Sequence, residues 1–195
     1  MTDTSQVQQR LERRTASSLN DLREAWGTMR TIDPVDYGPL PWYPDSVPDS
    51  VEEQLDTFAG IASVVTFYTD AHEETVLVYN RSGYWEPPGG AIEGRHLPAE
   101  TAVWEAEEET GLDVELTDLL YTGEVHYEYD DGGTVVLPLA AFVGHRTAGT
   151  LRVERERNDH PGVCRGVGLF GPDVLPENCR DREKILGLLP EQDVT

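Results

Sequence analysis

Three glutamates in the segment 87–112 have the type and spacing of a metal-binding site. Glu108 and Glu109 lie three and four positions after Glu105, so on an α-helix the three share one face and repel one another. Partial burial would force at least one of them to keep its proton, whereas a divalent cation would remove the conflict. Oxygen ligands in this number suit Mg²⁺ or Mn²⁺, and Mg²⁺ commonly bridges protein carboxylates to substrate phosphates.

Two glycines precede the predicted helix and would let the backbone approach a ligand closely. Gly89 and Gly90 follow two prolines and Trp85, and glycine has no Cβ to hold a bound group away. Trp85 has two interpretations, an aromatic that packs and anchors the loop or a ring that stacks on a base. A glycine loop leading into a carboxylate-bearing helix is typical of a site that processes phosphate groups.

The segment 90–112 resembles the Nudix box, whose pattern is G-x5-E-x7-R-E-U-x-E-E-x-G-U, where U is aliphatic. The spacing holds over the whole pattern without a gap, and the resemblance extends over about residues 58–190. The matching positions are Gly90, Glu105, Glu108, Glu109, Gly111 and Leu112, with Ala106 a loose match for the first aliphatic position.

The resemblance implies an α/β fold, with a Nudix-like α/β/α sandwich, a mixed sheet and here an N-terminal helical extension. It also implies hydrolysis, by water, of a nucleoside diphosphate linked to another moiety, with Mg²⁺ or Mn²⁺ as cofactor. Such an ion neutralises charge on the pyrophosphate and lowers the pKa of the attacking water. The expected partner is a small-molecule nucleotide.

Site residues follow from the same resemblance, position by position. Glu105, Glu108 and Glu109 are the expected catalytic residues and metal ligands, and the Gly89 carbonyl is a further candidate ligand. Gly89, Gly90 and Trp85 are the candidate substrate-binding residues.

The general base stays open at this stage. It is either Glu105 or an acid of a later loop, such as Glu154 or Glu156.

Two positions of the box depart from the pattern. His96 stands where the first glutamate is expected, and Trp104 stands where the arginine is expected. The two box charges are absent together, which is consistent with a pair, because either charge alone would lack its counter-ion. We interpret His96 and Trp104 as a strut-like pair, that is, two side chains in structural contact that replace the charged pair of the box. The alternatives are a remodelled substrate pocket or a decayed enzyme, in which the fold serves as a non-catalytic nucleotide-binding or regulatory module.

Composition narrows the function further. The chain has 37 acidic and 15 basic residues, a formal net charge of -22, and Lys184 as its one lysine. No basic patch is available for nucleic acid. The scarcity of lysine favours a halophilic protein in a salt-rich cytosol over a generic acidic one, because salt screens self-repulsion.

No apolar run could span a membrane, and we expect no signal peptide. Cys164 and Cys179 match no disulfide or zinc pattern, so a cytoplasmic compartment is expected.

The predicted organisation has three parts: an N-terminal helical arm at 1–32, a proline-rich connector with a short helix at 33–57, and a Nudix-like domain at 58–192. The arm shows a thin apolar seam through Leu11, Thr15, Ser18, Leu22, Ala25 and Met29. It either lies on its own domain or packs against a second subunit, which leaves a homodimer open. Ser50 has capping-box spacing for a helix at 51–58 that Gly60 would end.

The remaining elements are predicted from β-branched runs and turn residues. We expect a hairpin of strands at 61–69 and 75–80, a helix at 98–110 stopped by Gly111, and long strands at 113–127 and 134–144. Strands near 151–155 and 163–170 and a closing helix at about 180–189 complete the chain.

The salt interpretation predicts the response of stability to KCl. Because screening shortens the Debye length to about 3 Å at 1 M salt, we expect the free energy of unfolding to rise from low salt to molar KCl. Urea denaturation across a KCl series measures this. Equal stability at low and molar KCl would refute the interpretation.

Overall fold

The computed structural model of the protein describes residues 4–27, 30–40, 43–80, 83–94, 96–153 and 164–190. The chain forms two compact units. Unit 1 contains Met1–Ala62, Ala91–Thr101 and Leu119–Ala141, and unit 2 contains Ser63–Gly90, Ala102–Asp118 and Phe142–Thr195. The division predicted at residues 32 and 57 stays a prediction.

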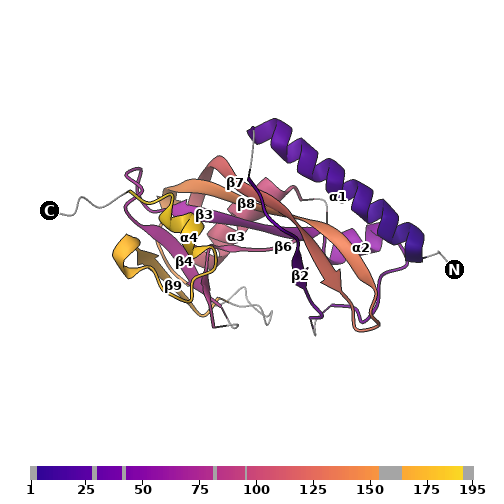
Figure 1. The fold of residues 1–195 in the computed structure, drawn as a ribbon. Helices are drawn as coiled ribbons and strands as arrows, with labels where there is room; N and C mark the ends of the chain where they lie inside the picture. The colour runs from indigo at the N-terminus through magenta and orange to yellow at the C-terminus, as the bar shows by residue number, and fades with distance from the viewer. Residues whose placement is uncertain are drawn as a thin grey trace. The chain divides into compact units, whose positions relative to one another are not determined.

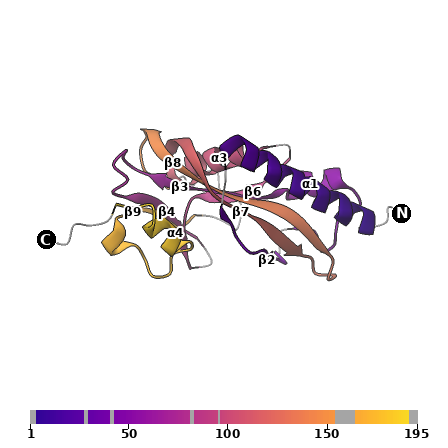
Figure 2. The ribbon, with the colours of Figure 1, turned by 45° about the horizontal axis from the view of Figure 1, so that its top comes forward.

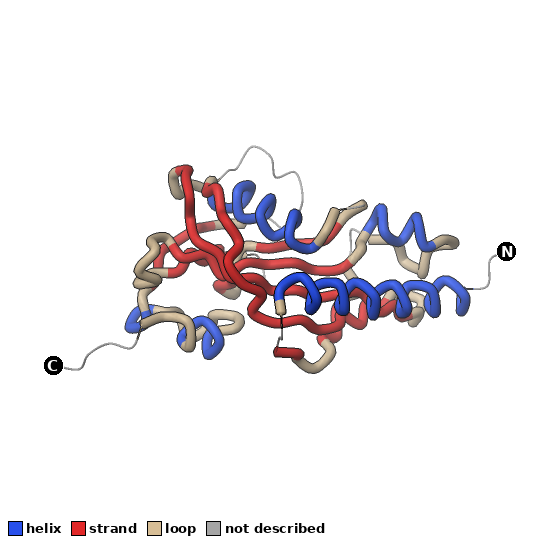
Figure 3. Tube along the Cα trace, turned by 90° about the horizontal axis from the view of Figure 1, so that it is seen from above, coloured by secondary structure: helices blue, strands red, loops and turns tan. Residues whose placement is uncertain are grey.

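Helices and strands alternate along the described residues, as expected for an α/β fold (Figure 3). The helices are α1 (Thr4–Trp26), α2 (Val51–Thr57), α3 (Pro98–Thr110) and α4 (Arg182–Leu186), with a 3-10 turn at Pro172–Val174. The strands are β1 (Arg30–Thr31), β2 (Val35–Tyr37), β3 (Gly60–Phe67), β4 (Thr75–Tyr79), β5 (Trp85–Glu86), β6 (Gly89–Ile92), β7 (Leu112–Glu128), β8 (Thr134–Gly149) and β9 (Gly166–Phe170).

The strands form a mixed sheet, as predicted. Its hydrogen-bonded order is β1-β7-β8-β3-β4-β5, and β2, β6 and β9 pair with β7, β3 and β4. Strands β1 and β2 run parallel to β7, whereas β4 is antiparallel to β3, β5 and β9. None of the described helices is long and apolar enough to cross a membrane.

In unit 1, α1 lies along β7 and β8 (Figure 1). Its buried residues are Val7, Leu11, Thr15, Leu19 and Leu22. The Thr15 hydroxyl donates to the Val136 carbonyl at 2.9 Å, and the Gln8 amide donates to the Thr134 carbonyl at 2.8 Å. These contacts place the apolar seam on the helix's own unit, and packing against a second subunit stays a prediction.

The predicted seam and extent of α1 need three corrections. Ala25 is exposed and is not one of the buried residues of the helix. Leu19 is buried where Ser18 was expected, because Ser18 is only partly covered. The helix ends at Trp26 and not near residue 30, since Gly27 adopts a left-handed φ of 93° and donates to the Arg23 carbonyl, an arrangement that closes a helix. Met29 lies outside the described residues.

The proline-rich connector is more structured than predicted. Strands β1 and β2 pair with β7 in parallel, which short runs interrupted by proline did not reveal. Its Tyr43 packs on other aromatic side chains: the ring stacks on Phe58 at 5.2 Å and contacts Tyr127 edge-on at 5.7 Å. Trp42 lies outside the described residues.

Helix α2 begins as predicted, because the Ser50 hydroxyl accepts the Glu53 N–H at 3.1 Å. Its predicted stop at Gly60 is wrong. Phe58 caps the helix by donating to the Gln54 carbonyl, and Gly60 begins β3. At Gly60 the φ is 144°, and a Cβ would lie 2.4 Å from the Pro138 carbonyl oxygen. Glycine at this position therefore allows β3 and β8 to pack closely.

Unit 2 is organised around β4. The predicted hairpin is confirmed by the pairing of Thr66 with Val76 and of Phe67 with Thr75. Strand β9 pairs with β4 on the edge opposite to β3 (Figure 2), and β5 pairs with β4 at Val78 and Tyr79. Helix α4 and strand β9 are shorter than predicted. Residues 151–153 are irregular, so the strand predicted there is absent from the part that the structure describes; the rest of that span lies outside it.

The docking of α1 gives a stability prediction. Leu11 is 0% exposed, so Leu11→Ala should lower the free energy of unfolding by about 2–5 kcal/mol through lost burial and a residual cavity. The exposed neighbour Glu12 supplies the control Glu12→Ala, expected within about 0.5 kcal/mol of the parent. Urea denaturation measures both. Equal effects of the two substitutions would mean that α1 is not packed on unit 1 in solution.

Candidate active site

Helix α3 presents the three glutamates on its partly covered side. Within unit 2 its buried side chains are Ala102, Ala106 and Thr110, each 0% exposed. Glu105, Glu108 and Glu109 are partly buried, whereas Glu107 is exposed. The helix spans the predicted residues and stops where Gly111 adopts a φ of 73°. The spacing that placed the three carboxylates on one helical face is therefore reproduced.

The glycine pair lies directly against these carboxylates. The Gly89 N–H donates to Glu109 Oε2 at 3.0 Å. A Cβ at Gly90 would lie 2.3 Å from Glu105 Oε1, so any other residue there would displace the Glu105 side chain. Gly90 is thus needed for close approach between strand β6 and helix α3, and the structure brings Gly89, Gly90, Glu105 and Glu109 together as the sequence predicted.

Glu109 combines burial with repulsion from its acidic neighbours. Burial raises the pKa of Glu109 well above its usual range, and the neighbouring Glu105 raises it further. The hydrogen bond from the Gly89 N–H lowers this pKa, and Glu86 and Glu108 raise it again. Burial and repulsion in the folded site therefore favour a proton on Glu109, and the role of a cation stays a prediction.

Glu86 is a member of the acidic cluster that the sequence reasoning did not single out. Its Oε2 forms an ion pair with Arg180 Nε at 2.9 Å, and its Oε1 accepts a hydrogen bond from the Asn80 amide. Burial raises the pKa of Glu86, the Arg180 guanidinium lowers it, and Asp181 raises it. Its position beside Trp85, three residues before Gly89, was the available signal. The partner Arg180 is distant in sequence, so only the fold reveals the pair.

Trp85 is packed within unit 2. Its ring lies 4.8 Å from Phe170, edge-on, and 5.2 Å from Tyr79. Its carbonyl accepts the Arg180 N–H at 2.8 Å, and its own N–H donates to the Asn178 carbonyl. This arrangement matches the packed-aromatic interpretation, and the substrate-binding role of Trp85 stays a prediction.

The donor set fits a hard divalent cation by its chemistry. Glu105, Glu108 and Glu109 supply carboxylate oxygens from one helical face, and such ligands suit Mg²⁺ or Mn²⁺. In the described part of the chain, no three His, Cys, Asp or Glu side chains form a group already arranged to hold a metal ion. Ligation by all three would therefore require their side chains to rotate toward a common point.

The remaining predicted site positions are less informative. His96 is exposed, and its N–H donates to the Glu93 carbonyl at 3.3 Å. Trp104 is 43% exposed on α3. Their strut-like pairing stays a prediction. The candidate bases Glu154 and Glu156 lie outside the described residues.

The fold and the site together define a Nudix-type α/β protein, and sequence comparison assigns the family. The NUDIX domain model matches residues 60–184. The chain therefore belongs to the Nudix family. No curated protein matches it.

Solved structures show the same fold at low identity. A MutT NUDIX hydrolase from Burkholderia pseudomallei is 21% identical with a TM-score of 0.50, over 68% of this chain and 98% of that one. The E. coli dihydroneopterin triphosphate pyrophosphohydrolase is 15% identical with a TM-score of 0.50, over 65% and 92%.

The raised pKa of Glu109 predicts a pH-dependent gain from removing its charge. The folded state holds this proton to higher pH than the unfolded chain, so ionisation costs stability above the unfolded pKa of about 4.3. We expect Glu109→Gln to raise the free energy of unfolding at pH 8 and to lose this advantage as the pH falls below about 4. Urea denaturation in EDTA at both pH values measures the effect.

Glu107→Gln is the matched control, because Glu107 is exposed on the same helix. It should show no comparable gain at pH 8. A Glu109→Gln variant that is no more stable than Glu107→Gln at pH 8 would contradict the assigned repulsion.

Proposed function

We propose that this protein is a Mg²⁺- or Mn²⁺-dependent Nudix hydrolase that cleaves the pyrophosphate bond of a nucleoside diphosphate linked to another moiety. The observation that carries the proposal is the apposition of Glu105 and Glu109 to the Gly89-Gly90 pair. Carboxylates on a helix beside backbone that carries no side chains let a phosphate group and a cation meet at one place. Membership of the Nudix family supports the same chemistry.

Each residue of the proposed site has its own role. Glu105, Glu108 and Glu109 would hold the divalent cation, which when bound neutralises pyrophosphate charge and acidifies water. The Gly89 N–H orients Glu109 through its bond to Oε2. Gly90 leaves room for the Glu105 carboxylate.

Glu105 is our candidate general base. It would take a proton from the water whose oxygen attacks one phosphorus, while the bond between that phosphorus and the bridging oxygen breaks. The released phosphate group leaves with the electron pair of that bond. A carboxylate can perform this transfer if it lies within hydrogen-bond reach of the water.

Arg180 supports recognition of an anionic substrate. Its Nε is engaged by Glu86 at 2.9 Å, and its guanidinium lies 5.3 Å from the centre of the Tyr84 ring. The side chain is 51% exposed, so guanidinium donors remain available for phosphate oxygens. In a chain of net charge -22, such a cation offsets repulsion between the site and a nucleotide.

The cellular setting that we propose rests on composition. The charge of -22 and the single lysine support a salt-rich cytoplasm. A homodimer through α1 belongs to the same group of proposals, and sedimentation of the full chain in molar KCl would test it.

The activity is tested with a panel of nucleoside diphosphate sugars, dinucleotides and nucleoside triphosphates in molar KCl. We expect the parent protein to release phosphorylated products with Mg²⁺ and none with EDTA. Glu109→Gln should lower the rate by about a hundredfold or more, because it removes a charged ligand at nearly constant shape. Glu107→Gln, exposed on the same helix, should keep the parent rate. Product release is followed by phosphate-sensitive assay and chromatography.

Metal binding is measured separately from hydrolysis, by thermal unfolding. Mg²⁺ should raise the melting temperature of the parent and of Glu107→Gln, and raise that of Glu109→Gln less. If no panel member is hydrolysed while nucleotides bind measurably, the hydrolase proposal fails and the non-catalytic nucleotide-binding module takes its place.

A further inference from the structure

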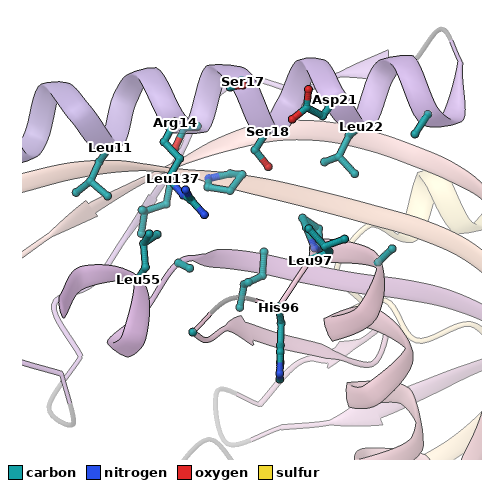
Figure 4. Close-up of a pocket in the computed structure, with 18 of the residues that line it drawn as sticks. Leu11, Arg14, Ser17, Ser18, Asp21, Leu22, Leu55, His96, Leu97 and Leu137 are labelled. Atoms are coloured by element: carbon teal, nitrogen blue, oxygen red, sulfur yellow. The ribbon is translucent and has the colours of Figure 1, made fainter. Parts of the chain in front are cut away.

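Unit 1 contains a cavity that the proposed hydrolytic chemistry does not use. Its volume is about 380 Å³, within the range of about 300–1,000 Å³ common for small-molecule sites. It lies beneath α1 and is bounded by the end of α2, the start of α3 and residues of β8 (Figure 4). None of the three site glutamates lines it.

The interior of the cavity is mostly aliphatic. Leu11 and Leu22 from α1 face Leu55 from α2 and Leu137 from β8 across the space (Figure 4). Leu97, at the start of α3, is 62% exposed at this cavity. An apolar molecule seated here would cover that leucine and gain from its removal from water.

Arg14 is the charged side chain that points into this space. Figure 4 shows it directed from α1 toward Leu55 and Leu137, together with Ser18, whereas the Asp21 carboxylate stays beside the helix and the His96 ring turns away from α1. Among the described residues, no ion pair or hydrogen bond is formed by the Arg14 side chain.

The neighbouring arginines of α1 differ in this respect. Arg10 lies 3.9 Å from Glu52, and Arg13 donates to the Gln9 carbonyl at 3.2 Å. Arg14 is exposed to solvent and has no acidic partner among the described residues. In a chain with 37 acidic and 15 basic residues, its guanidinium is therefore available to a ligand of negative charge at the edge of this aliphatic cavity. The Ser18 hydroxyl, one helical turn further on, offers a second donor.

We propose that this cavity binds a small amphipathic carboxylate, with its hydrocarbon body among the leucines and its carboxylate on Arg14. The planar guanidinium matches a carboxylate through two parallel hydrogen bonds. A neutral hydrocarbon would gain nothing from the guanidinium, and an organic cation would meet like charge. The site is independent of the hydrolytic chemistry, so it stands whether or not that proposal does.

The test compares octanoate, 1-octanol and octylammonium as probes of equal chain length on the full chain. Binding is measured by titration calorimetry at the lowest KCl concentration at which circular dichroism shows the folded protein. We expect octanoate to bind more tightly than octanol, and octylammonium to bind least. Arg14→Gln should weaken octanoate binding by about tenfold or more and leave octanol binding unchanged.

Arg13→Gln is the matched control, because Arg13 carries the same charge one position away and does not line the cavity. It should bind octanoate like the parent. Ser18→Phe, which fills the cavity from the helix, should abolish binding of both octanoate and octanol while the circular dichroism spectrum is kept.

Three results would overturn the proposal. Octanoate could bind no better than octanol, or Arg13→Gln could weaken octanoate as much as Arg14→Gln does, which would reduce the effect to surface charge. Alternatively, octanoate affinity could fall as protein concentration rises, with dimers seen by sedimentation, which would assign the cavity to a second copy of the chain.

Discussion

The mutual repulsion of carboxylates on helix α3 is the constraint on which the candidate site depends. Burial and the nearby Glu105, Glu86 and Glu108 raise the pKa of Glu109, so the folded chain stores an unfavourable charge arrangement. Natural proteins retain such arrangements where a function uses them. A bound cation would convert the repulsion into affinity, which explains why an otherwise ordinary helix carries so many acids.

The surrounding fold holds these side chains close instead of letting them separate. Ala102 and Ala106 are fully buried, and their small side chains let the helix pack closely. On the facing strand, Gly90 leaves no atom where Glu105 sits, and the Gly89 N–H fixes one oxygen of Glu109. The backbone therefore imposes proximity that the side chains alone would avoid.

The candidate ligand site of unit 1 has the opposite charge, because it contains an arginine and not a group of carboxylates. There the acidic composition of the chain leaves the Arg14 guanidinium facing aliphatic side chains. In the site of unit 2, excess negative charge calls for a cation; in the cavity of unit 1, an unmatched positive charge calls for an anion. The two cases differ in burial. Glu109 is partly buried, where an unpaired charge is costly, whereas Arg14 is exposed and available to a ligand.

Much of the fold and site was accessible from the sequence because the relevant signals are local. The helix at 98–110 and the hairpin before it follow from periodicity, capping and glycine placement. Signals of longer range were missed. The parallel strands β1 and β2 are two and three residues long, and their pairing with β7 depends on a partner far along the chain.

The sequence by itself determined the family and the helical face shared by Glu105, Glu108 and Glu109, because each depends on spacing within one short segment. Only the tertiary structure showed that Glu86 lies near Glu109 and pairs with Arg180. It also showed that Arg14 faces a cavity. These features join residues that are distant in the chain, and their proximity is set by packing, which no local pattern encodes.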